Sequence, residues 1–127
     1  MRCLQGFLAG AVAIACNGCF GPDPGQGRKA ETGFHAAAPV IVALDAYRAQ
    51  RGHYPAKLMQ LVPVYISDPS DLQLSRERYP VFNDLVRGFS YSREGDTFTL
   101  GFRYSGPGMN DCVYHSRSKK WDSSGYY

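Results

Sequence analysis

The chain has 127 residues, of which 44% are hydrophobic and 13% are aromatic, so it is long and apolar enough for one domain with a small core. Its 14 basic and 11 acidic residues nearly balance, and the basic residues are scattered along the chain. The composition excludes a largely disordered chain, and the absence of a basic stripe argues against nucleic-acid binding.

The first residues have the pattern of a signal peptide at 1–15. Arg2 is followed by apolar and small residues from Phe7 to Ala15, a run much shorter than the roughly 20 residues that a membrane-spanning helix requires. The sequence "AIA" fits cleavage for ordinary secretion without lipid. The sequence "AIAC" resembles the box of bacterial lipoproteins, in which the cysteine, here Cys16, becomes the first mature residue and carries the lipid.

The lipoprotein resemblance implies that acyl chains such as palmitate hold Cys16 in a membrane of the bacterial cell envelope. In enterobacterial lipoproteins an Asp after the cysteine retains the protein in the inner membrane, and the residue here is Asn17. We therefore expect the outer membrane, facing the periplasm, rather than the inner membrane. Residues 16–33 are rich in Gly, Pro and polar residues, which predicts a flexible tether before a head at 34–127.

The remaining cysteines bear on disulfide bonding. Cys3 would leave with the signal peptide and Cys16 would be lipidated, so Cys19 and Cys112 remain in an oxidising compartment. A disulfide between Cys19 and Cys112 is one expectation, and free or intermolecular thiols are the alternative.

A helix is predicted between Glu31 and Gly52, where apolar residues recur at three- and four-residue spacings. Pro39 cannot donate a backbone hydrogen bond, so either the firm helix starts close to Pro39 or an earlier turn is kinked there. Gly52 supplies a left-handed residue that ends the helix, and Tyr54-Pro55 favours an extended exit. A short helical turn is predicted next, in "AKLMQLVPVYI", and it should pack against the main helix.

The second half of the chain changes to a period of two, which is typical of strands. Phe89 and Tyr91 alternate before the turn "REGD", and apolar residues alternate after it, which predicts a hairpin. Further strands are expected around 112–116 and after Trp121. These patterns predict an α+β fold in which one main N-terminal helix packs on a small antiparallel sheet. Its core is expected to include Leu44, Tyr47, Leu61, Phe98, Leu100 and Phe102.

The stretches "ALDAYRAQRGHYPAKLMQLVP" and "CVYHSRSKKW" resemble the globular heads of type IV pilin-like proteins, especially the type II secretion pseudopilins. The resemblance implies a helix that packs across a small antiparallel sheet. The chain lacks the family's processing site, its long apolar polymerising helix and the calcium loop of the major pseudopilins. The resemblance therefore implies a fold and does not extend to building a filament.

The sequence shows no pattern of catalytic or metal-binding residues. His35, His53 and His115 are the only histidines, and none lies at a metal-ligand spacing from another. There is no Gly-x-Ser-x-Gly elbow, and Ser116 beside His115 would point to the opposite face of a strand. We expect no enzyme activity, no metal and no cofactor.

Aromatic residues are the remaining candidates for function. Tyrosine and tryptophan favour interface cores, so Tyr114, Trp121 and Tyr126 are candidate contacts for a protein partner, each with a competing role in packing. The sequence thus predicts a non-catalytic envelope lipoprotein, attached to the membrane by lipid, that binds a protein partner or serves as an accessory module. The alternatives are a pseudopilin-like component of a secretion system and a small envelope hydrolase.

Overall fold

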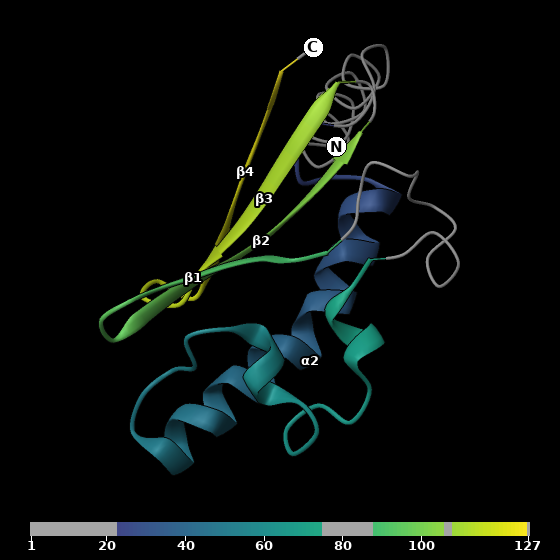
Figure 1. Cartoon of the computed structure of the whole chain (residues 1–127). Helices are drawn as coiled ribbons and strands as arrows, with labels where there is room; N and C mark the ends of the chain where they lie inside the picture. The colour runs from purple at the N-terminus through teal and green to yellow at the C-terminus, as the bar shows by residue number, and fades with distance from the viewer. Residues whose placement is uncertain (1–22, 75–87, 106–107, 127) are drawn as a thin grey trace, which may run out of the picture.

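The computed structural model describes residues 23–74, 88–105 and 108–126 and confirms the α+β fold class. One long helix, α2 (Arg28–Arg51), packs on an antiparallel sheet, and two short 3-10 helices, η1 (Leu58–Leu61) and η2 (Pro69–Leu72), follow it (Figure 1). The sheet consists of β1 (Ser90–Glu94), β2 (Thr97–Ser105), β3 (Met109–His115) and β4 (Lys120–Tyr126). The predicted signal peptide, Cys16 and Cys19 lie outside the described residues.

The start of α2 differs from one of the two predicted alternatives. The helix begins at Arg28, so a firm helix that starts close to Pro39 is wrong. The early turns bury Ala30 and Gly33, and this packing compensates for the hydrogen bond that Pro39, on the exposed side of the helix, cannot donate. Residues 28–33, predicted to belong to the tether, therefore form the first turns of the helix.

The end of α2 confirms the predicted stop. Gly52 has a φ of 82°, in the left-handed region, and its N–H donates to the carbonyl oxygen of Arg48 at 2.7 Å. Arg48 and Arg51 occupy the last turn, where positive charge is favoured by the helix dipole. The chain then leaves through Tyr54 and Pro55, which are both buried.

The sheet is a meander in which the strands lie in the order β1-β2-β3-β4. The predicted hairpin is present, because β1 and β2 are joined at Gly95 and pair from Glu94 and Thr97 outward. Alternate residues of β2, from Phe98 to Tyr104, are buried toward α2, whereas Arg103 between them is exposed. One face of the sheet therefore covers the helix and the other carries polar side chains.

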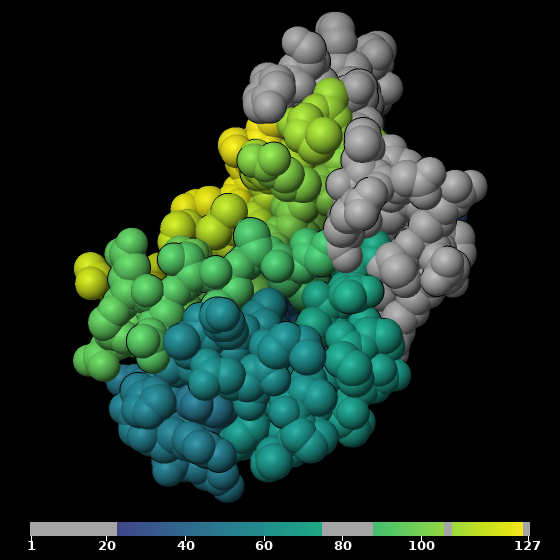
Figure 2. Space-filling view, viewed as in Figure 1, coloured from purple at the N-terminus to yellow at the C-terminus, as the bar shows by residue number. Residues whose placement is uncertain are grey.

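The core contains every residue that the sequence predicted for it. Leu44, Tyr47, Leu61, Phe98, Leu100 and Phe102 are all buried. A larger cluster joins the C-terminal half of α2 to η1, η2 and the first half of β2, and a smaller one joins the N-terminal half of α2 to Leu74 and to β2 and β3. Figure 2 shows the teal residues after α2 lying directly against the green hairpin.

Candidate functional site

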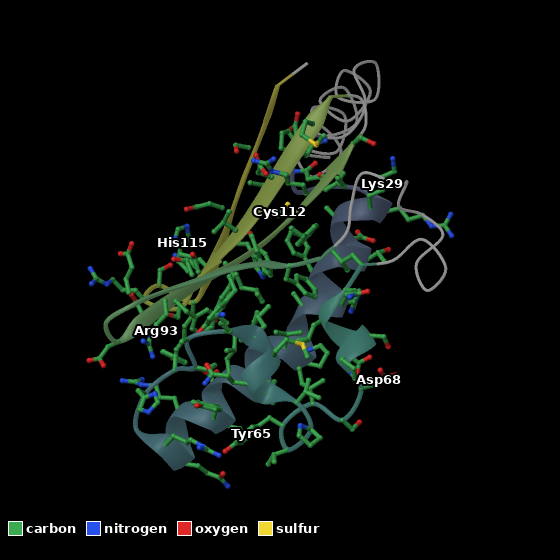
Figure 3. All side chains as sticks on the ribbon, viewed as in Figure 1. Lys29, Tyr65, Asp68, Arg93, Cys112 and His115 are labelled. Carbon is green, nitrogen blue, oxygen red and sulfur yellow. The ribbon has the colours of Figure 1, made fainter. Side chains whose placement is uncertain are left out.

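The chain leaving α2 forms a corner that the sheet holds in place. We call Asp45, Arg48, Gly52, Tyr54 and Pro55 the α2 corner. The Tyr91 hydroxyl donates to the carbonyl oxygen of Pro55 at 2.6 Å, and Nη1 of Arg93 donates to the carbonyl oxygen of Tyr54 at 2.9 Å. Both donors come from β1, and Figure 3 shows Arg93 at this end of the head. The hairpin therefore fixes the backbone of the corner by two hydrogen bonds.

Aromatic rings fill the space beneath the corner. The Tyr54 ring meets the Phe98 ring edge to face, with 4.7 Å between their centroids. Phe98 also contacts Tyr91 and Tyr114, each at a centroid distance of 5.9 Å. Such contacts add to the area that the rings bury and fix their orientation. The corner is thus a rigid part of the head.

The outer side of the corner is a shallow, open depression lined by Asp45, Arg48, Ala49, Gly52 and Tyr54. The Tyr54 hydroxyl donates to Oδ1 of Asp45 at 3.4 Å, and the Arg48 guanidinium lies over the Tyr54 ring at 5.2 Å from its centroid. The sequence placed these residues on the helix and its exit, but it gave no sign that they line one depression.

The tyrosines around the corner remain protonated near neutral pH. Burial raises the pKa of Tyr54, the negative charge of Asp45 adds to this effect, and Arg48 opposes it. Burial also raises the pKa of Tyr91 to about 12. Both phenols therefore act as hydrogen-bond donors. The depression offers a carboxylate, a guanidinium and a phenol to a bound group, which suits polar contacts better than proton transfer.

The three residues predicted to contact a partner lie on β3 and β4. Tyr114 and Trp121 are directly opposite each other in the ladder, and their rings are 5.5 Å apart. Trp121 also contacts Phe34 at 4.8 Å, and both Tyr114 and Trp121 are partly buried beside the core. Tyr126 pairs with Met109 at the other end of β4, and its side chain lies outside the described residues. The structure brings together only the first two.

Cys112 is buried inside the head. Its Sγ accepts a hydrogen bond from Oγ of Ser123 at 3.3 Å, and burial raises the pKa of the thiol. The thiol is therefore protonated and unreactive near neutral pH. Because Cys19 lies outside the described residues, the predicted pairing of Cys19 with Cys112 stays a prediction.

His115 and Ser116 have separate partners. Nε2 of His115 lies 3.1 Å from Oδ2 of Asp122, and the two side chains are 40% and 82% exposed. The Ser116 Oγ accepts a hydrogen bond from the backbone N–H of Phe98 at 2.8 Å. This serine extends the β2–β3 ladder by one pair beyond Thr99 and His115. The histidine pairs with a carboxylate on the neighbouring strand, β4.

Within residues 23–74, 88–105 and 108–126, no three His, Cys, Asp or Glu side chains lie close enough together to hold a metal ion. No helix in the described part of the chain is both long and apolar enough to cross a membrane. Comparison of the sequence with protein-family models and with curated proteins, and of the structure with solved structures, found no match.

Proposed function

We propose that this chain is a lipid-anchored, non-catalytic protein of the bacterial cell envelope, whose pilin-like head binds a protein partner. The observation that carries the proposal is where the residues that resemble pilin-like heads lie in the fold. Gly52 ends α2 in the left-handed conformation, and the apolar residues around it form the helix–sheet junction. The buried members of this set are Leu44, Tyr47, Tyr54, Pro55 and Leu61.

α2 packs on its own sheet, as the resemblance to pilin-like heads implies. The helix buries its apolar residues against its own sheet, from Ala30 near the start to Tyr47 near the end. The proposed attachment to the membrane is the lipid on Cys16, in the "AIAC" sequence.

Lipidation is tested by metabolic labelling with palmitate. The unaltered chain is expected to incorporate the label, and Cys16→Ser is expected to abolish it, because the thiol at this position accepts the lipid. Cys19→Ser, three residues further on, is the matched control and should be labelled like the unaltered chain. Equal labelling of the unaltered chain and Cys16→Ser would contradict the proposal.

Partner binding is tested by crosslinking in native membranes, followed by affinity capture of the tagged full-length chain. Trp121 is the preferred contact because it lies on an edge strand, partly exposed beside Tyr114. Trp121→Ala is expected to lose the crosslinked partner, since truncated interface tryptophans typically cost about 2 kcal/mol or more of binding. Trp121→Phe keeps an aromatic ring and is expected to retain most of it.

Circular dichroism must show that both Trp121 variants are folded, because Trp121 also contacts the core. Retention of the same crosslinked species by folded Trp121→Ala would place the contact elsewhere. Capture of no protein, together with filaments formed by the unaltered chain alone, would overturn the proposal in favour of a pseudopilin-like component.

A further inference from the structure

The residues immediately before α2 are attached to the sheet. We call residues 23–29 the docked segment. The backbone N–H of Gly25 donates to the Tyr104 hydroxyl at 2.9 Å, and Nζ of Lys29 donates to the carbonyl oxygen of Ser105 at 2.6 Å. Tyr104 and Ser105 are the last residues of β2. Figure 3 shows Lys29 at this end of the head, opposite the end that carries His115.

Two glycines allow the docked segment to approach the sheet closely. A Cβ atom on Gly25 would lie 2.3 Å from Oγ of Ser123, and Gly25 has a φ of 81°. A Cβ atom on Gly125 would lie 3.0 Å from Cγ of Pro24. These positions accept no larger residue without a shift, so the backbone of the docked segment rests on the end of β4.

Chain length limits how far the head can move from an anchor at Cys16. Only residues 17–22 separate Cys16 from the docked segment. The seven Cα-to-Cα steps from Cys16 to Asp23 span at most about 25 Å. The 24 residues of α2 make a helix about 36 Å long, which runs from the docked segment to the α2 corner. If the head stood with the α2 corner against the bilayer, the docked segment would lie about a helix length away from the bilayer, which is beyond this reach.

We propose that the end of the head formed by the docked segment, Ser105 and Met109 faces the lipid surface, and that the α2 corner and the β3–β4 turn point away from it. This orientation rests on the lipidation of Cys16 proposed above. It places Tyr126, which pairs with Met109, nearer the bilayer than Tyr114 and Trp121, which pair further along β3 and β4.

The short chain between Cys16 and the docked segment, rather than attraction to lipid, sets this orientation. The end that faces the bilayer carries Arg28 and Lys29, but also Asp23 and Glu31, so its charges balance. A strong electrostatic pull toward anionic lipid needs an excess of basic residues.

The orientation is tested with the processed protein purified from bacterial membranes and reconstituted into nanodiscs that contain a dansyl-labelled headgroup lipid. Trp121 is the single tryptophan of the chain, so Trp121→Phe gives a protein without a tryptophan that could donate energy to the dansyl group. In that background, Arg28→Trp and Arg117→Trp place the same substitution at exposed positions at opposite ends of the head. Energy transfer to the lipid is expected to be several-fold stronger from Arg28→Trp.

Two further measurements complete the test. Trp121 of the unaltered chain lies between the two ends, because its ring contacts Phe34 near the start of α2, so it should transfer more than Arg117→Trp and less than Arg28→Trp. Insertion of about 20 Gly and Ser residues before Asp23 should bring the two arginine variants close together, because the longer chain no longer restricts the head. Equal transfer from both variants without the insertion, stronger transfer from Arg117→Trp, or a difference that survives the insertion would overturn the proposed orientation.

Mass spectrometry of the same purified protein distinguishes a failure of the proposed lipid anchor from a failure of the proposed orientation. A mass without lipid at Cys16 would overturn the proposed anchor and the orientation with it. A lipid at Cys16 combined with equal transfer from the two ends would overturn the orientation alone.

Discussion

Gly33→Leu is expected to lower the free energy of unfolding of the head by about 1 to 3 kcal/mol, because overpacking a well-filled core forces side chains and backbone to shift. A Cβ atom on Gly33 would already lie 2.2 Å from Cε2 and Cζ of the Phe102 ring. That ring is itself held by Phe34 and Trp121, each at a centroid distance of 5.6 Å. The loss should appear as a lower midpoint of urea denaturation.

The matched control for Gly33→Leu is Ala38→Leu, which introduces the same side chain on the exposed side of α2. Its effect is expected to stay within about 0.5 kcal/mol, as for most surface substitutions. Equal midpoints for the two variants would mean that the first turns of α2 do not rest on Phe102.

Leu44→Ala is expected to lower the free energy of unfolding by about 2 to 5 kcal/mol, through lost burial and the cavity that remains. Leu44 has no exposed surface and lies in the larger core cluster between α2, η1 and the sheet. Val42→Ala is the control on the same helix, because the Val42 side chain is 68% exposed. Denaturation midpoints that place Leu44→Ala beside Val42→Ala would contradict the packing of α2 on the sheet.

Most of the fold could be predicted because its signals are local. The alternation from Phe98 to Tyr104 places four apolar side chains on one face of β2, and the structure buries all four. Gly52 followed by Tyr54-Pro55 marks the end of α2 by backbone preference alone, and the helix does end there.

The exact start of α2, three residues before Glu31, could not be predicted because the local signals for a helix are weak there. Gly33 and Pro39, both inside the helix, are weak helix formers. What stabilises these turns is contact with β2 and β3, distant in the sequence. The buried positions, such as Ala30 and Gly33, recur at helical spacing, but their side chains are too small to give a strong apolar signal. Tertiary packing outweighs local preference here.

The candidate site was predictable only in part. Tyr114 and Trp121 were singled out as aromatic residues, but their direct opposition depends on the β3–β4 register. The bonds from Tyr91 and Arg93 to the α2 corner join side chains of β1 to backbone carbonyls, a kind of contact that leaves no trace in the sequence. Alternation in "SYSRE" does place Tyr91 and Arg93 on one face, the single signal that could have suggested a shared role.

The meander order of the sheet has a consequence for the sequence of events in folding. Each strand pairs with the one before it, so every ladder closes a short loop at a small cost in chain entropy. α2 is synthesised first and its C-terminal half can pack on η1 and η2, but its N-terminal half is covered by β2 and β3, which are synthesised later. During synthesis the N-terminal half of α2 is therefore exposed until β2 and β3 have been made. Because every ladder is local, we expect the hairpins to form first and α2 to dock on the sheet late in folding.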